Sequence, residues 1–169
     1  LTIDLARAQV EVTLKEKVPL MVSALGTPRW LVEECHAVGT KVMSMVGAVR
    51  HAPRLEQMGV DIIVAQGMEA GGHVGTVTTM VLVPSVVDAV SVPVLAAGGI
   101  IDGRGIAAGM MLGAQGAWIG TRFIATEEAR GHINYKHKIV DIDEDGTVVS
   151  RANSGKTARM IRNAFTESW

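Results

Sequence analysis

The chain has 169 residues, of which 48% are hydrophobic, 20% charged and 4% aromatic. The length fits one domain of ordinary size, and the composition excludes a wholly disordered chain. No apolar run approaches the roughly 20 uncharged residues of a membrane-spanning helix, so we expect no membrane partner. The net charge of −1 argues against a nucleic acid as the main partner.

The cysteine count and the first residues indicate the expected cellular compartment and the extent of the chain. Cys35 is the single cysteine, which excludes an internal disulfide and a multi-cysteine metal site. We therefore expect a reducing, cytoplasmic localisation and no metal site. The sequence begins at Leu1 without a Met or a signal segment, and we expect it to be a piece of a longer protein.

Five short apolar runs rich in Val, Ile and Met predict β-strands. Their hydrophobic residues are continuous rather than alternating, which is typical of parallel strands that are buried on both faces. The predicted strands are Val18–Leu25, Lys41–Val46, Asp61–Ala65, Val92–Ala97 and Ala117–Ile119.

Helical patterns lie between these strands. The first pattern begins after Thr27 and Pro28, a capping residue followed by a proline at the first helical position. The second and fourth patterns end at Gly59 and Gly113, which are typical stop signals. The predicted helices are Arg29–Ala37, Val49–Met58, Thr79–Ala89 and Gly103–Leu112. This alternation of strand and helix indicates repeated βαβ units.

Two architectures accommodate such units: a doubly wound open sheet and part of an eight-stranded barrel. In a doubly wound fold the phosphate-binding loop follows the first strand, whereas in a barrel the phosphate site follows the last two strands. The two best phosphate loops here, at Gly98-Gly99 and Gly120-Thr121, follow the last two predicted strands. We therefore predict an α/β fold, a (β/α)8 TIM barrel of which this chain holds roughly strands 4 to 8.

The remainder of the chain differs in composition. From Thr126 onward it is polar and charged, with a predicted helix over Asn134–Val140 and a strand over Thr147–Ser150. We accordingly divide the chain into residues 1–125, the barrel part, and 126–169, a tail that packs on the barrel or forms a small extra domain. Its basic side chains are interpreted as a solvated surface: Lys138, Arg151, Lys156, Arg159 and Arg162.

The segment QGMEAGGHVG, residues 66–75, directly follows the third predicted strand. In a barrel this is the mouth where ligands bind. Glycines around His73 leave room for a substrate, and an imidazole exchanges protons near neutral pH, so His73 is a candidate catalytic base or else an exposed turn histidine. Gln66 could hydrogen-bond a heterocycle or the backbone. Glu69 is interpreted as a surface charge rather than as a catalytic acid.

Two further glycine-containing loops could hold a phosphate. In AAGGIIDGRG, residues 96–105, Gly98 and Gly99 leave backbone N–H groups open to an anion. In AWIGTRF, residues 117–123, Gly120 and Thr121 would clamp the same phosphate from a second side. Asp102 is expected to cap the helix that follows the first loop.

Other polar side chains are interpreted as structural. We expect Arg104 to be solvated, Arg122 to pair with a nearby carboxylate, and Cys35 to lie in a helix without a catalytic partner. The remaining histidines do not share a helix face at the spacing of metal ligands; they are His36, His51, His132 and His137.

The quoted segments QGMEAGGHVG, AAGGIIDGRGIAAG and GAQGAWIGTRFIATEEA, in this order, resemble the nitronate monooxygenase (2-nitropropane dioxygenase) family. That family also includes FMN-dependent enoyl-acyl-carrier-protein reductases. The similarity runs from about Leu20 to the end, including TARMIRNAF. The family's first strand, which lines the flavin ring, has no counterpart here.

The resemblance implies a barrel that binds FMN. It implies that Gln66, Gly71 and Gly72 lie against the flavin, and His73 matches the family's catalytic histidine. The residues that it implies for the FMN phosphate are Gly98, Gly99, Gly120 and Thr121.

Three functions follow as alternatives. The first is a monooxygenase that oxidises alkyl nitronates with oxygen, with FMN as cofactor. The second is a reductase in which NAD(P)H reduces FMN, which then reduces an enoyl thioester or a quinone. The third is a non-catalytic fragment or assembly domain. The expected partner is a small-molecule substrate. Association of two copies as a homodimer is a further alternative.

Overall fold

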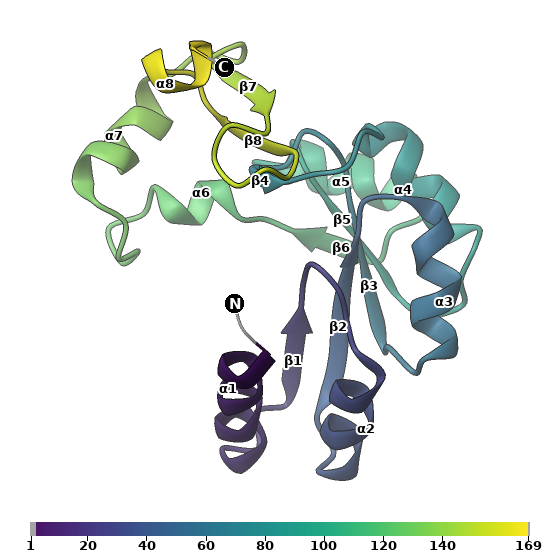
Figure 1. Cartoon of the computed structure of the whole chain (residues 1–169). Helices are drawn as coiled ribbons and strands as arrows, with labels where there is room; N and C mark the ends of the chain where they lie inside the picture. Colours follow the sequence, from purple (N-terminus) through teal and green to yellow (C-terminus); the bar gives the residue numbers. More distant parts are fainter. Residues whose placement is uncertain (1–2, 169) are drawn as a thin grey trace.

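The computed structural model describes residues 3–168, and its main feature is a five-stranded parallel sheet (Figure 1). The strands are hydrogen-bonded in the order β1-β2-β3-β5-β6. Their bounds are β1 Leu20–Ser23, β2 Lys41–Val46, β3 Ile62–Gln66, β5 Val94–Ala97 and β6 Gly116–Trp118. Each strand therefore lies beside the one that follows it in the chain, apart from the short β4.

This order decides between the two predicted architectures. The strand order of a doubly wound sheet reverses at a switch point, whereas the order here never reverses. Consecutive parallel strands joined by outer helices are the wall of a (β/α)8 barrel, as predicted. Among residues 3–168, β1 and β6 each pair with only one strand of this sheet.

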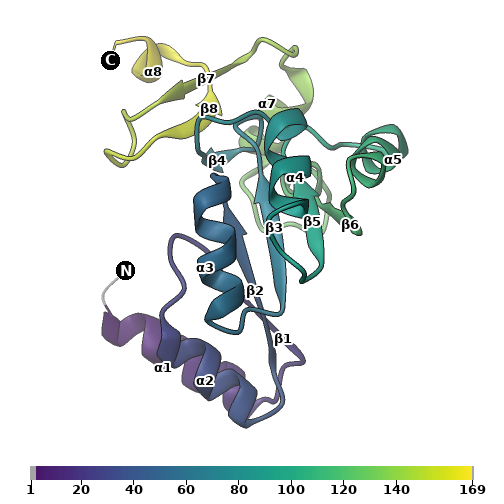
Figure 2. The ribbon, with the colours of Figure 1, turned by 90° about the vertical axis from the view of Figure 1, so that its right-hand side faces the viewer.

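Helices cover one face of the parallel sheet (Figures 1 and 2). The first helix, α1, lies beside α2, where the Arg7 guanidinium stacks over the Trp30 ring at 4.7 Å. The helices and the 3-10 turn are α1 Ile3–Lys15, α2 Arg29–Ala37, η1 Val49–His51, α3 Ala52–Gln57, α4 Thr79–Val87 and α5 Gly103–Met111. Helix α1 was not predicted, because its branched residues obscured the helical period.

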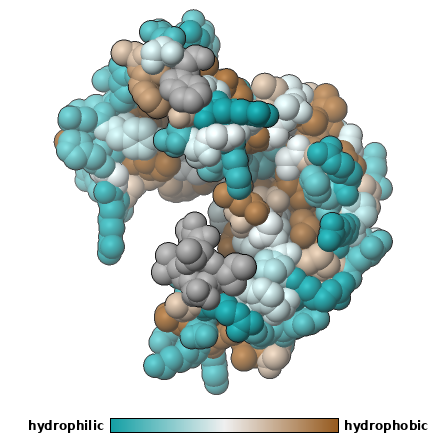
Figure 3. All heavy atoms as spheres, viewed as in Figure 1, coloured by the Kyte–Doolittle hydropathy of each residue, from teal (hydrophilic) through white to brown (hydrophobic). Residues whose placement is uncertain are grey.

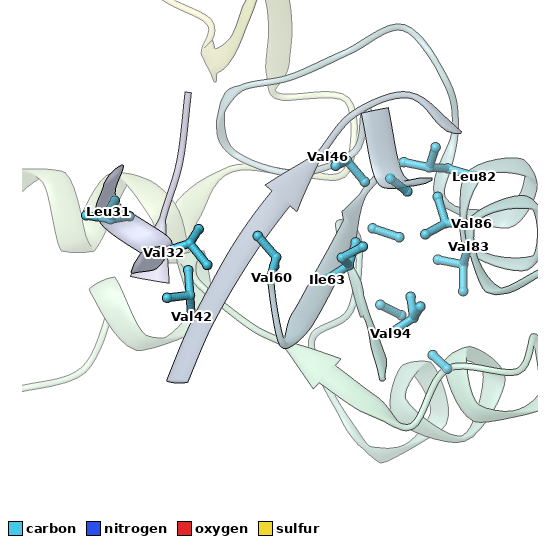
Figure 4. Packing of buried hydrophobic residues seen from close by; sticks show 14 of the residues in the cluster. Leu31, Val32, Val42, Val46, Val60, Ile63, Leu82, Val83, Val86 and Val94 are labelled. Atoms are coloured by element: carbon cyan, nitrogen blue, oxygen red, sulfur yellow. The ribbon is translucent and has the colours of Figure 1, made fainter. Parts of the chain in front are cut away.

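The core explains why the strands have continuous apolar sequences. Val42 and Ile63 belong to one buried cluster with residues of the helices; Val42 lies beside Val32 of α2, and Ile63 lies on the side toward Val83 of α4 (Figure 4). The neighbouring residues Met43 and Val64 belong to a second buried cluster. Because successive side chains point to opposite faces of a strand, both faces need hydrophobic residues.

The tail forms a second sheet, in the antiparallel order β4-β8-β7. Strands β7 (Thr147–Ser150) and β8 (Ala158–Ile161) form a hairpin, and β8 also pairs with β4 (Gly72–His73). The register places His73 opposite Ala158. The tail is thereby attached to the loop after β3, which contains the candidate catalytic residue His73. The short helix α6 Thr121–Ile124 precedes the tail, whose own helices are α7 Ile133–Asp141 and α8 Ala164–Glu167.

Two sequence interpretations are wrong in local detail. Thr27 does not cap α2: Pro28 is the N-cap residue, and the Thr27 hydroxyl hydrogen-bonds Ser44 at 2.7 Å. The helix predicted over Val49–Met58 is divided into η1 and α3, with Pro53 in the first turn of α3. The predictions missed β4, β8, α6 and α8, which are too short to show a hydrophobic period. No helix in residues 3–168 is long and apolar enough to cross a bilayer.

Candidate functional site

The loops that follow β3, β5 and β6 meet at the carboxyl end of the parallel sheet. The N–H of Gly67 donates to the carbonyl of Ala97 at 2.9 Å, which joins the first two loops. A Cβ atom added to Gly71 would lie 2.9 Å from the Thr121 hydroxyl oxygen. The structure therefore brings together three sequence segments that lie apart along the chain.

Glu69 holds the loop after β3 against the start of α4. Its carboxylate accepts hydrogen bonds from the Thr79 N–H at 2.9 Å and the Thr79 hydroxyl at 2.8 Å. The carboxylate satisfies an N–H group of the first helical turn that has no partner within the helix. The interpretation of Glu69 as a surface charge is therefore wrong; it is a half-buried structural residue.

His73 lies in this loop and is half-buried. The Gln66 side-chain nitrogen donates to the His73 carbonyl at 2.8 Å. The His73 Nε2 lies 2.9 Å from the Ser154 hydroxyl, which the tail supplies. Gln66 and His73 are thus in direct contact, and Ser154 is a site neighbour that sequence reasoning missed, because 81 residues separate it from His73.

The two glycines after β5 have backbone conformations that favour glycine. Gly98 has φ +102° and Gly99 has φ +70°, in the left-handed region that other residues rarely adopt. A Cβ at Gly98 would also lie 2.9 Å from the Thr79 hydroxyl oxygen. Among residues 3–168, no protein hydrogen bond uses the N–H of Gly98, Gly99 or Thr121. These groups remain available to an anion.

An open cleft of about 1390 Å³ lies beside these loops. Gln66 and His73 line it, together with residues after β1 and β2 and from the β7–β8 turn. Figure 3 shows the molecule hollowed between the part that carries β1 and the small sheet. The other predicted site residues lie outside the cleft lining: Gly71, Gly72, Gly98, Gly99, Gly120 and Thr121. The candidate phosphate loops are therefore next to the cleft, but these residues do not form its lining.

The remaining candidates have structural roles. Asp102 caps α5 as predicted, since its side chain accepts from the Arg104 and Gly105 N–H groups. Hydrogen bonds from Arg104 hold the pKa of the Asp102 carboxyl below its ordinary value. Cys35 is fully buried, and burial together with the charge of Glu34 raises the pKa of its thiol. In the described part of the chain, no cluster of three or more His, Cys, Asp or Glu could hold a metal ion.

Comparisons with known proteins agree with this arrangement. A family model described as nitronate monooxygenase matches residues 2–169. A Mycobacterium tuberculosis protein named as a monooxygenase is 50% identical over 162 residues, which are 95% of this chain and 43% of that protein.

Two solved structures are similar over nearly the whole chain. FabK from Thermotoga maritima has a TM-score of 0.93 and 43% identity, covering 99% of this chain and 54% of FabK. Nitroalkane oxidase from Streptomyces ansochromogenes has a TM-score of 0.88 and 33% identity, covering 96% of this chain and 50% of that one. The chain thus spans about half the length of the relatives that it matches.

Proposed function

Because this chain belongs to the nitronate monooxygenase family, we propose that it carries the phosphate loops and the catalytic base of an FMN-dependent oxidoreductase. The observation that carries the proposal is the meeting of the loops after β3, β5 and β6 beside a cleft that His73 lines. Ligand sites of barrels lie at this end of the strands.

The residues fit an FMN phosphate. The free N–H groups of Gly98, Gly99 and Thr121 can donate to phosphate oxygens, and the Thr121 hydroxyl and the Gly120 backbone lie in the adjacent loop. Gln66, Gly71 and Gly72, in and after β3, would lie against the flavin ring. When bound, FMN supplies the capacity to accept and pass on electrons.

We propose alkyl nitronates as the substrates, with oxygen as the second reactant and a carbonyl compound and nitrite as products. His73 would take the proton from the carbon beside the nitro group when the neutral nitroalkane is offered. The cleft brings a substrate within reach of this imidazole, whose Nε2 lies beside the Ser154 hydroxyl. A base in contact with a hydroxyl group and open to a cleft can accept such a proton.

A second candidate is a reductase that uses NAD(P)H and acts on an enoyl thioester or a quinone. The specific observation in its favour is that identity to FabK, at 43%, exceeds identity to nitroalkane oxidase, at 33%. A non-catalytic domain is the third candidate, and failure to bind flavin would favour it.

Stopped-flow absorbance of the flavin separates the candidates. For a nitronate monooxygenase, an alkyl nitronate reduces the flavin under anaerobic conditions, and NAD(P)H reduces it slowly or not at all. Fast bleaching by NAD(P)H without a response to nitronate would replace the first candidate with the reductase. Absence of flavin bands after reconstitution with FMN would reject both.

A further inference from the structure

The Thr79 hydroxyl lies between two loops of the candidate site. Its oxygen is 2.8 Å from a Glu69 carboxylate oxygen, in the loop after β3, and 3.0 Å from the Gly98 carbonyl oxygen, in the loop after β5. The Ala97 carbonyl oxygen is farther away, at 3.4 Å, and already accepts the Gly67 N–H at 2.9 Å. Thr79 therefore links the two loops at a point that the proposed flavin contacts do not include.

Glu69 fixes the position of this hydroxyl. Its carboxylate accepts from the Thr79 N–H at 2.9 Å as well as from the hydroxyl, so it holds both the backbone and the side chain of that residue. Threonine has a stiff first side-chain torsion, and Thr79 is half-buried. A hydroxyl has one proton, which Thr79 shares between the Glu69 carboxylate and the Gly98 carbonyl.

The contact with Thr79 sets the orientation of the peptide group between Gly98 and Gly99. No cis peptide bond occurs among residues 3–168, and in a planar trans peptide the C=O and N–H bonds point in opposite directions. Since the Gly98 carbonyl is directed at Thr79, the Gly99 N–H points away from Thr79. Gly99 is exposed, and in the described part of the chain its N–H has no protein acceptor. The N–H is thus presented to a ligand.

The turn over residues 67–70 supports the two glycines from the other side. The Ala70 N–H donates to the Gly67 carbonyl at 3.1 Å, which closes this turn. A Cβ added to Gly98 would lie 3.1 Å from the Ala70 nitrogen, and one added to Gly99 would lie 3.4 Å from the Glu69 Cβ. Such close packing leaves the glycines no room to move toward the turn, so the Thr79 contact decides how the peptide is rotated.

We propose that Thr79 is a positioning residue for the flavin phosphate and makes the site select phosphorylated flavin over riboflavin. Its hydroxyl, held by Glu69, directs the Gly99 N–H toward a phosphate oxygen, and a hydrogen bond to such an anion is charge-assisted and strong. The inference rests on the proposed function, because the phosphate in question is that of FMN.

Thr79→Val separates the phosphate from the flavin ring. Valine fills nearly the same space, but it has no proton to donate to the Gly98 carbonyl, and the peptide that follows is free to rotate. The backbone N–H at position 79 remains for Glu69, so the loop after β3, which would lie against the ring, keeps its attachment to α4. The variant should therefore weaken FMN and leave riboflavin unchanged.

Titration of the purified, flavin-free protein with FMN and with riboflavin, followed by flavin fluorescence, tests the inference. The ratio of the two dissociation constants measures what the phosphate contributes to binding. We expect Thr79→Val to reduce the preference for FMN by about tenfold or more, and Thr79→Ser, which keeps the hydroxyl, to retain most of it. Thr78→Val is the matched control, because Thr78 is exposed and its side chain makes no capping hydrogen bond to α4.

The inference is overturned if folded Thr79→Val keeps the wild-type preference, if it weakens both flavins equally, or if Thr78→Val has the same effect. Circular dichroism melts establish that each variant is folded. If the wild-type protein binds neither flavin, the proposed function fails, and amide hydrogen exchange of the flavin-free protein tests the contact by itself. Thr79→Val should then speed exchange of the Gly67 N–H, which donates to Ala97 at the start of the loop after β5, and Thr78→Val should not. Unchanged exchange would reject the positioning role of Thr79.

Discussion

His73 is the residue on which the proposed chemistry depends. It is joined to Gln66 through its own carbonyl and to Ser154 through its ring. The backbone and the imidazole are therefore held from two sides, one in the barrel and one in the tail. The sequence indicated the glycine-rich surroundings of His73, but not its contact with the tail.

Substitution of His73 by Asn tests its role as a base. The neutral nitroalkane must lose a proton and the preformed nitronate has already lost it, so the variant should harm the first reaction more. A positioned base contributes about 10²–10⁴-fold, and we expect a loss of that order in kcat/KM for the nitroalkane. His137→Asn, on α7, is the control. Equal losses with both substrates would contradict the assignment.

A substitution at Gly99 tests whether the loop after β5 holds the FMN phosphate. Its φ of +70° disfavours any side chain, and a Cβ would lie 3.4 Å from the Cβ of Glu69. Gly99→Val should therefore reduce the FMN content of the purified protein, measured by absorbance after reconstitution. Gly103→Val, in the same segment but with open space around its added Cβ, should keep the cofactor. Full FMN occupancy in folded Gly99→Val would show that this loop does not hold the phosphate.

At the scale of elements, Asp61, which precedes β3, links its own segment to α2 and β2 through hydrogen bonds. Its carboxylate accepts from Lys41 Nζ at 2.7 Å, from the Val42 N–H at 2.8 Å and from His36 Nε2 at 2.8 Å. Burial acts to raise the pKa of Asp61, but these hydrogen bonds outweigh it and hold the pKa below its ordinary value. The ionised carboxylate is therefore the stabilising form.

Because the pKa of Asp61 is lowered in the folded state, the free energy of unfolding depends on pH. Stabilisation is present above the pKa of Asp61 in the unfolded chain and is lost as the pH falls through the folded-state pKa. Asp61→Asn should lower the free energy of unfolding by about 1.5–3 kcal/mol at pH 7, and the difference should shrink below about pH 4. Urea unfolding at several pH values measures it, with exposed Asp88→Asn as control. A difference that does not change with pH would contradict this.

Arg159 joins β8 to the loop after β3. Its Nε donates to the Met68 carbonyl at 2.9 Å, and its Nη1 donates to the Thr147 hydroxyl at 2.8 Å. The interpretation of Arg159 as part of a solvated surface is therefore wrong. The side chain is half-buried and is positioned by the pairing of β8 with β4.

Arg159→Met keeps much of the apolar stem of the side chain and removes both hydrogen bonds. We expect about 1–3 kcal/mol of destabilisation, because the Met68 carbonyl loses its donor, and faster hydrogen exchange at residues 72–74. Arg162→Met, at an exposed position just after β8, should change neither quantity. Unchanged exchange in Arg159→Met would mean that the strand pairing alone holds the loop.

At the scale of the molecule, the parallel sheet has two edges without a further strand among residues 3–168. Exposed edges offer unpaired N–H and C=O groups to other chains, and five strands do not close a standard barrel. The 169-residue chain expressed alone should therefore self-associate, as measured by light scattering after size-exclusion chromatography. A monodisperse monomer with a cooperative thermal transition would contradict this expectation.

The sequence by itself determined the parallel βα architecture and the position of the glycine-containing loops after β5 and β6. Strands buried on both faces need continuous apolar residues, and glycines such as Gly98 and Gly99 stand where the backbone takes positive φ. Such signals are local, because each depends on a few neighbouring residues. The short strands β4 and β8 have no such signal.

Only the tertiary structure decided how the tail meets the barrel. The pairing of His73 with Ala158, the contact of its ring with Ser154 and the hydrogen bond from Arg159 to Met68 each join residues more than 80 positions apart. The same holds for the cleft, whose lining comes from residues after β1 and β2, from Gln66 and His73, and from the β7–β8 turn. Long-range contacts depend on how the whole chain folds back on itself, and short sequence patterns do not record that geometry.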